Sequence, residues 1–311
     1  MKITGVGSLP HTDPVEAARF VIETTDVPHL PQLPRRHRQE GMLVQWGDGL
    51  CGLGAAGADP IGLAVGVPPG PREEAFVGAT TAMEVFAAAG VDVVKTQMTG
   101  PITLGLTALA AGRRIDGLWT CVVDGLARRA AAHVTSIAER LPGAEIHLVV
   151  DEPSLIAFAP GRPEGPISVA DAGSVLTEFF AALDVPAGLH CCGDTDWGMV
   201  ARLRPASISL DVHALDDGFR EHAAELAEAI GDGTRLVWGL VPSRPGPVDR
   251  SVVERRYGTA MARLVMEGAA TTALIDDAWA SPSCGLAAVS AKAAATVMSR
   301  LREIVGGLRA R

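Results

Sequence analysis

The chain alternates short apolar runs with longer stretches in which apolar residues recur every three or four positions. Nearly continuous apolar runs are typical of parallel strands that are buried on both faces. The runs predict strands at Ile3–Val6, His29–Leu33, Val91–Thr96, Ile146–Asp151, Ala187–Cys191, Ser207–Asp211, Leu236–Leu240 and Thr272–Ile275.

The three- and four-residue spacing predicts amphipathic helices between these runs. The first helix has a clear start, because Asp13 is a good N-cap and Pro14 suits the first helical position. The predicted helices are Pro14–Thr24, Glu73–Ala89, Leu118–Arg140, Val169–Leu183, Asp217–Ile230, Val248–Glu267 and Leu286–Val305.

A strand followed by a helix, repeated about eight times, predicts an α/β fold of the (β/α)8 TIM-barrel type. A doubly wound open sheet is the alternative. The Gly-rich stretch Gly41–Gly70 is expected to form a long irregular loop near the barrel mouth. Because no clear linker interrupts the 311 residues, residues 1–311 are expected to form a single barrel domain.

Composition narrows the choice of partners. The net charge of −9 argues against binding to nucleic acid or to an anionic membrane. There is no apolar run of about 18 residues, so no spanning helix is expected. The opening MKITGVGSLPHTD lacks the long apolar segment of a signal peptide, which favours a cytoplasmic location.

The five cysteines form an odd and sparse set for so long a chain, which does not indicate a disulfide framework. Cys51 and Cys121 are expected to be buried packing residues, because cysteine is often fully buried. No pair has the C-x-x-C spacing of a redox centre. Cys191, Cys192 and Cys284 remain as reduced thiols that could bind metal, react or pack.

In a barrel of this type the chemistry lies at the carboxyl ends of the strands. The polar residues expected there are Gly7-Ser8, Lys95-Thr96-Gln97, Asp151-Glu152, His190-Cys191-Cys192, Asp211 with His213, Ser243-Arg244, and Asp276-Asp277 leading to Cys284. His213 is expected to be a hydrogen-bonded loop residue. The pair Asp276-Asp277 could be an acid/base couple or a cap at a strand end.

His190 and Cys192 carry the strongest chemical signal. Residues two apart in a strand point to the same side, so these two side chains can converge on one ion while Cys191 faces the other way. Zinc prefers nitrogen and sulfur ligands in a tetrahedron. Cys284, in a turn-rich loop, is the natural third ligand, and Asp211 is a plausible fourth. The alternative is that the H-x-C pair occurs by chance and that the thiols only pack.

Six motifs together resemble the C-terminal catalytic barrel of the cobalamin-independent methionine synthase family, within the wider superfamily of uroporphyrinogen decarboxylase and zinc methyltransferases. They occur in the family's order and span about residues 3 to 290. They are GVGSLPHTD from Gly5, KTQMTGPITL from Lys95, VVDEPSL from Val149, HCC from His190, SISLD from Ser207 and WASPSCGL from Trp279.

The resemblance implies a (β/α)8 barrel and an enzyme that transfers a methyl group to a zinc-activated thiol, with homocysteine giving methionine as the leading reaction. It implies His190, Cys192, Asp211 and Cys284 as zinc ligands, with Asp211 where the family has glutamate. It also implies that Gly7, Ser8 and Asp151 hold the amino-acid end of the thiol substrate. No catalytic residue beyond these is assigned.

The methyl donor implied by the resemblance is a folate or a methyl-corrinoid protein. Ala157 stands where the family has a glutamate that contacts the homocysteine amine, Pro242 where it has a histidine, and Thr107 near its folate-site tryptophan. These departures leave three alternatives: a corrinoid-linked methyltransferase to another thiol, a decarboxylase-like relative that binds a tetrapyrrole, and an inactive barrel. The run Arg35–Arg38 either favours the tetrapyrrole alternative or is a solvated loop, and the acidic net charge opposes that alternative because a tetrapyrrole substrate is polyanionic.

Overall fold

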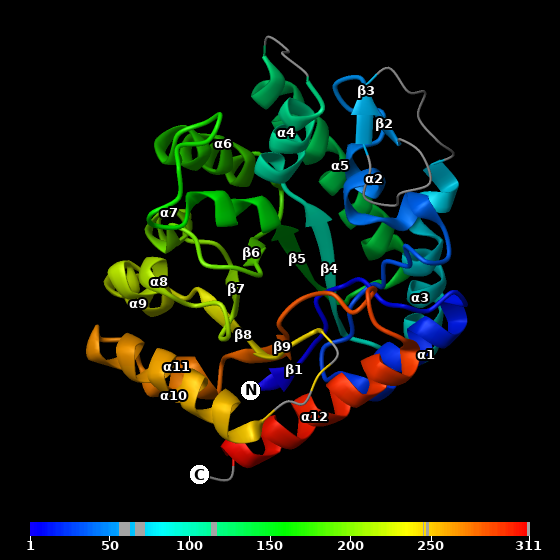
Figure 1. Ribbon diagram of the computed structural model, residues 1–311. Helices are drawn as coiled ribbons and strands as arrows, with labels where there is room; N and C mark the ends of the chain where they lie inside the picture. The colour runs from blue at the N-terminus through cyan, green and yellow to red at the C-terminus, as the bar shows by residue number, and fades with distance from the viewer. Residues whose placement is uncertain (56–62, 66–71, 113–116, 245, 247–248, 310–311) are drawn as a thin grey trace.

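The computed structural model describes residues 1–55, 63–65, 72–112, 117–244, 246 and 249–309. Its main sheet contains seven strands in the order β1-β9-β8-β7-β6-β5-β4, and every neighbouring pair is parallel. The sheet curls into a barrel-like wall, which confirms the predicted α/β barrel (Figure 1). The strands are β1 Lys2–Ile3, β4 Val93–Thr99, β5 Glu145–Asp151, β6 Ala187–Cys191, β7 Ser207–Asp211, β8 Arg235–Val241 and β9 Trp279–Pro282.

Extended chain at residues 26–32 lies between the two ends of this sheet. On one side the amide of Val27 donates to Ile3 O and the amide of Gln32 donates to Gly7 O. On the other side Leu30 N donates to Lys95 O, and Lys95 N donates to Pro28 O. The predicted strand His29–Leu33 therefore occupies the eighth position, but as isolated bridges and not as a regular strand.

The prediction of a last strand at Thr272–Ile275 is wrong, because these residues form helix α11 (Thr271–Ile275) and the strand is β9. A short apolar run fits a helix turn as well as a strand, so the pattern alone could not separate them. Asp276 and Asp277 consequently precede the last strand. Asp276 O accepts from the amino group of Met1, and Asp277 O accepts from Arg235 at the start of β8. They lie at the end of the barrel opposite to the strand termini where they were expected.

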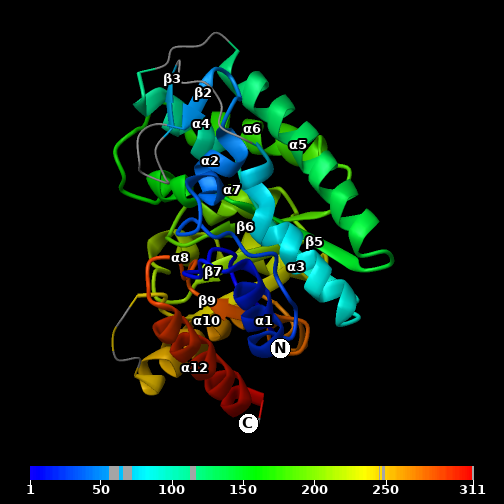
Figure 2. The same ribbon diagram turned by 90° about the vertical axis from the view of Figure 1, so that its right-hand side faces the viewer.

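Helices cover the outer side of the sheet in both views (Figures 1 and 2). The N-cap prediction is confirmed, because Asp13 Oδ1 accepts from Val15 N and Glu16 N. Four helices begin or divide differently from the prediction, and α2, α4 and α7 were not predicted. The helices are α1 Pro14–Thr24, α2 Met42–Gly47, α3 Val77–Ala88, α4 Pro101–Ala110, α5 Leu118–Arg140, α6 Val169–Ala181, α7 Trp197–Arg202, α8 Asp217–Glu221, α9 Ala223–Gly231, α10 Arg250–Met266, α11 Thr271–Ile275 and α12 Ala291–Arg309.

The stretch Gly41–Gly70 is more ordered than an irregular loop. It contains α2 and a two-stranded antiparallel sheet of β2 (Leu53–Ala55) and β3 (Leu63–Val65), while residues 56–62 and 66–70 lie outside the described residues. Figures 1 and 2 show this unit beside α4 and α5.

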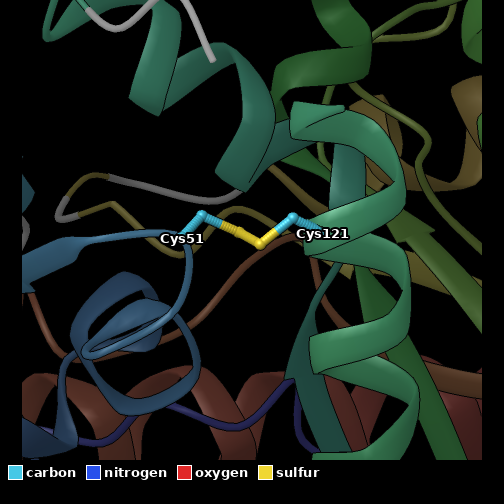
Figure 3. The surroundings of a disulfide bond; sticks show 2 residues. All are labelled: Cys51 and Cys121. Atoms are coloured by element: carbon cyan, nitrogen blue, oxygen red, sulfur yellow. A yellow bond between two sulfur atoms is a disulfide. The ribbon is translucent and has the colours of Figure 1, made fainter. Parts of the chain in front are cut away.

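A disulfide joins Cys51, just before β2, to Cys121 in the first turn of α5 (Figure 3). This corrects the expectation that both are unbonded packing residues. The two cysteines are 70 positions apart in the sequence, and only the fold brings their Cα atoms to 6.1 Å, within the range that a disulfide spans. Spacing along the chain therefore gave no sign of the pair.

None of the helices that the structure describes is both long and apolar enough to cross a membrane.

Candidate metal centre and substrate site

His190 lies in the fully buried strand β6, whose neighbours Leu189 and Cys191 belong to the apolar core. Because side chains alternate along a strand, His190 points to the opposite side, into the barrel. Its Nδ1 lies 2.9 Å from Ser209 Oγ on the adjacent strand β7. Its Nε2 is buried and has no hydrogen-bond partner among the described residues. One ring nitrogen is thus held and the other is available for a ligand.

Cys192 and Cys284 complete a cluster with His190. One ligand atom from each of the three residues lies within 4.8 Å of the other two. Cys284 reaches this position from the loop after β9, which is fixed to the end of the first strand: Leu286 N donates to Ser8 O over 2.7 Å. The predicted convergence of these three side chains is therefore present in the structure. Cys191 stays in the core, as its position in the strand requires, and burial raises the pKa of its thiol to about 12.

The two thiols of the cluster are coupled through one contact. A hydrogen bond with Cys284 lowers the pKa of Cys192, whereas the same contact and burial raise the pKa of Cys284. For His190, burial works to lower the pKa, but the contact with Cys284 and the charge of Asp151 outweigh it and raise the pKa. Of these two thiols, Cys192 therefore loses its proton more easily, and the thiolate is the form of cysteine that binds metal.

Asp211 ends β7 next to the cluster, but its carboxylate is not one of the three mutually close ligand atoms. Its Oδ1 accepts from His213 N over 2.8 Å, and its pKa, which burial raises, is lowered in part by a hydrogen bond from Ser283. Ser283 precedes Cys284 in the chain, so the carboxylate lies beside the third cluster residue. His213 is a hydrogen-bonded loop residue as expected, since its Nε2 lies 2.9 Å from Leu240 O.

Asp151 ends β5 beside His190, its register partner on β6. The residue is 7% exposed, and its Oδ1 is buried with no partner among the described residues. Burial raises its pKa, and the charges of His190 and Lys95 oppose that effect. A small cavity of about 10 Å³ inside the barrel is lined by these three side chains among others. An unpartnered carboxylate oxygen in this position suits a cationic group.

Gly7 and Ser8 follow β1 on the same side of the barrel. A Cβ at Gly7 would lie 2.4 Å from Gln97 Cδ, so only glycine fits there. Ser8 Oγ donates to Gln32 Oε1 over 3.0 Å. Within the described part of the chain, the backbone amides of Gly7 and Ser8 make no hydrogen bond to a protein acceptor. Two unused amides next to the Cys284 loop can donate hydrogen bonds to a carboxylate.

The pattern of the sequence did not single out the role of Glu152. This side chain is fully buried and accepts from Ile102 N and Thr103 N at the start of α4, while its own amide donates to His190 O. Burial raises its pKa to about 7. Glu152 therefore joins the end of β5, the first turn of α4 and the His190 strand. The only signal was its place next to Asp151 at a strand end.

Residues 76–306 match the family model for the catalytic domain of cobalamin-independent synthase. No curated protein sequence matches the chain.

The solved structures that share the fold include the following two. One is the putative vitamin-B12-independent methionine synthase from Listeria monocytogenes, with a TM-score of 0.53 and 15% identity over 98% of this chain and 97% of that one. The other is a B12-independent methionine synthase from Shewanella sp. W3-18-1 in complex with selenomethionine, with a TM-score of 0.61 and 14% identity over 99% of this chain and 97% of that one.

Proposed function

Because the chain belongs to the family of cobalamin-independent synthase catalytic domains, which are methyltransferases, we propose that it is a zinc-dependent enzyme that methylates homocysteine to give methionine. The observation that carries this proposal is the convergence of His190, Cys192 and Cys284. We further propose that residues 1–311 form one catalytic domain.

The donor set fits zinc. One imidazole nitrogen without a hydrogen-bond partner and two thiol sulfurs are the ligand types that Zn²⁺ prefers, and three protein ligands leave a fourth position that either Asp211 or a substrate thiol can take. Asp211 is proposed as a further ligand, because its carboxylate lies beside the Cys284 loop. Zinc bound there would supply Lewis acidity that lowers the pKa of a coordinated thiol.

The chain's own residues would hold the amino-acid end of the substrate. Asp151, with its unpartnered Oδ1, would accept hydrogen bonds from the ammonium group. The amides of Gly7 and Ser8 would donate to the carboxylate, close to the loop that carries Cys284. Fixing the substrate at these two points would orient its sulfur toward the cluster and toward a methyl donor, which is the effect by which enzymes convert binding into rate.

The methyl donor in this proposal is a folate or a methyl-corrinoid protein. A specific feature favours testing other thiols as acceptors: Ala157, in the short helix Pro153–Phe158, stands where the family resemblance places a glutamate for the homocysteine amine. Asp151 is then the main carboxylate for that amine. The second candidate function is methyl transfer from a corrinoid protein to a thiol without an amino-acid end.

The test is the metal content of the purified protein and of four variants. We expect about one zinc per chain in the wild type, loss of zinc in Cys192→Ser and Cys284→Ser, and weaker binding in Asp211→Ala. Cys191→Ala is the matched control, because this adjacent thiol faces the core and should leave zinc content unchanged.

Zinc-edge X-ray absorption then tests the reaction. Addition of homocysteine should bring a further sulfur into the zinc shell, and supply of methyltetrahydrofolate or methylcobalamin should give methionine. 2-Mercaptoethanol serves as the acceptor without an amino-acid end. Absence of zinc from protein purified without chelators would refute the proposal, and zinc whose shell never changes with either thiol would indicate an inactive barrel.

A further inference from the structure

A second pocket lies on the outer rim of the barrel, between the loop that follows β7, helix α8 and helix α10. Its volume of about 390 Å³ is in the range of small-molecule sites. Val212, Leu215, Phe219 and Ala260 contribute apolar surface to its lining. Phe219 and Ala260 are buried side chains from two different helices, so the wall is part of the packed fold.

Four arginines line the same pocket, and Asp216 is its one acidic lining residue. The arginines are Arg220 on α8 and Arg255, Arg256 and Arg263 on α10. The protein as a whole carries a net charge of −9, so a cluster of four positive side chains is opposite in sign to the net charge of the protein. A pocket with one sign of charge and apolar walls attracts ligands of the opposite sign.

Two of these arginines are already paired with carboxylates, and two are not. Arg220 pairs with Asp217, and Arg263 pairs with Glu267 over 3.1 Å. Among the described residues, neither Arg255 nor Arg256 has a carboxylate within 4.0 Å. An unpaired guanidinium offers a planar fork of donors that matches a carboxylate or a phosphate.

The pocket is separate from the metal centre, but residues of both sites hydrogen-bond to the backbone of His213. Arg256 Nη1 donates to His213 O over 3.1 Å, and the amide of His213 donates to Asp211 Oδ1 over 2.8 Å. Arg256 is thus held by the backbone, with its other donors left for a ligand. Arg255 makes no such hydrogen bond, although its charge acts on Asp249, the N-cap of α10.

We propose that this pocket binds an organic anion whose apolar portion packs on Val212, Leu215 and Phe219 and whose carboxylate or phosphate group is held by Arg255 and Arg256. The apolar residues account for the organic portion, and the two unpaired guanidiniums account for the charge. The site requires neither a metal nor the methyl transfer proposed above, so it stands or fails independently of that reaction.

The experiment is isothermal titration calorimetry of the full chain at low salt with four probes. They are 2,6-naphthalenedicarboxylate, 1-naphthyl phosphate, inorganic phosphate and the neutral 2-naphthalenemethanol. We expect at least one naphthyl anion to bind, inorganic phosphate to bind more weakly, and the neutral alcohol not to bind. The better of the two naphthyl anions identifies the ligand as a carboxylate or as a phosphate ester.

Variants locate the binding. Arg255→Glu should weaken it about tenfold or more, because a charge-assisted contact becomes a repulsion. Thr259→Glu, which adds a negative charge to an exposed lining position, should weaken it as well. Arg19→Glu is the matched control, since Arg19 is exposed on α1 and does not line the pocket. Equal affinity in wild type and Arg255→Glu, equal binding of the neutral alcohol, or no binding of any probe would overturn the proposal.

Discussion

Ser209 Oγ lies 2.9 Å from His190 Nδ1, on the neighbouring strand and at the position directly paired with His190. This contact holds one ring nitrogen and leaves Nε2, which is buried and has no hydrogen-bond partner in the described structure, for a ligand. In metal sites, a partner on the second ring nitrogen fixes the tautomer and the orientation of the ligating histidine. Ser209 is therefore a positioning residue for the proposed zinc centre, supplied by the strand register itself.

We predict that Ser209→Ala lowers zinc affinity about tenfold to a hundredfold, the usual cost of losing such a partner. Chelator competition measures the affinity directly. Ser207→Ala is the matched control: Ser207 lies two residues earlier on the same face of β7 and, within the described structure, makes no hydrogen bond to the ring. Equal affinities in the two variants would show that the contact does not orient His190.

Asp151→Asn should raise the KM for homocysteine about tenfold to a hundredfold, because a hydrogen bond to a charged group contributes about 1.5 to 3 kcal/mol. The amide keeps the shape of the side chain but removes its charge. For 2-mercaptoethanol, which has no ammonium group, the same variant should leave the KM unchanged. An equal rise for both thiols would mean that Asp151 supports the site as a whole and does not recognise the amine.

The parts of the fold that the sequence predicted best are those with unambiguous local patterns. Strands β6 and β7 were predicted at their observed bounds, because continuous apolar runs end there at polar residues. The position of His190 and Cys192 two residues apart was enough to predict that they converge and that Cys191 does not.

The parts that could not be predicted depend on three-dimensional proximity. The residues of Thr271–Ile275 are compatible with either a strand or a helix. They form a helix because of their place in the fold, before β9. The Cys51–Cys121 pair and the His190–Ser209 contact join residues from separate elements, and their distance in the sequence carries no sign of either. The arginine pocket likewise needs α8 and α10 to be packed before it exists.

Because the side chain of His29 is buried without a hydrogen-bond partner in the described structure, we predict that the folded protein loses stability in acid. It is 2% exposed, neither ring nitrogen has a hydrogen-bond partner in the described structure, and burial together with the charge of Lys95 lowers its pKa to about 3. In the unfolded chain the pKa is about 6.5. Between these values the unfolded state binds the extra proton, so stability falls as the pH drops from about 6.5 toward 3, by up to about 4 kcal/mol.

Urea denaturation at a series of pH values measures this effect. In His29→Leu the free energy of unfolding should fall less between pH 6.5 and 3 than it does in the wild type. The difference between the two declines is the contribution of His29. His133→Gln provides a comparison, because burial lowers the pKa of His133 to about 4. The loss of stability that His133 causes should therefore end near pH 4, whereas the loss caused by His29 continues to about pH 3. Parallel curves for wild type and His29→Leu would contradict the prediction.

Because of the Cys51–Cys121 disulfide, we predict that the free energy of unfolding depends on whether a reductant is present. It closes a loop with a sequence separation of 70 and joins the segment before β2 to the start of α5. In the chain-entropy account, closing a loop of this length stabilises the folded state by up to about 4 kcal/mol, because the unfolded chain loses freedom. Denaturation with and without dithiothreitol should therefore give a lower free energy of unfolding when the reductant is present.

The double variant Cys51→Ser/Cys121→Ser separates this effect from any action of the reductant on the cluster thiols. It should have the lower stability under both conditions and should not respond to dithiothreitol, while Cys192 and Cys284 remain in place. Mass measurement after alkylation shows which thiols are blocked in the untreated protein. If the wild type and the double variant lost stability equally on reduction, the response would belong to the cluster thiols and not to the crosslink.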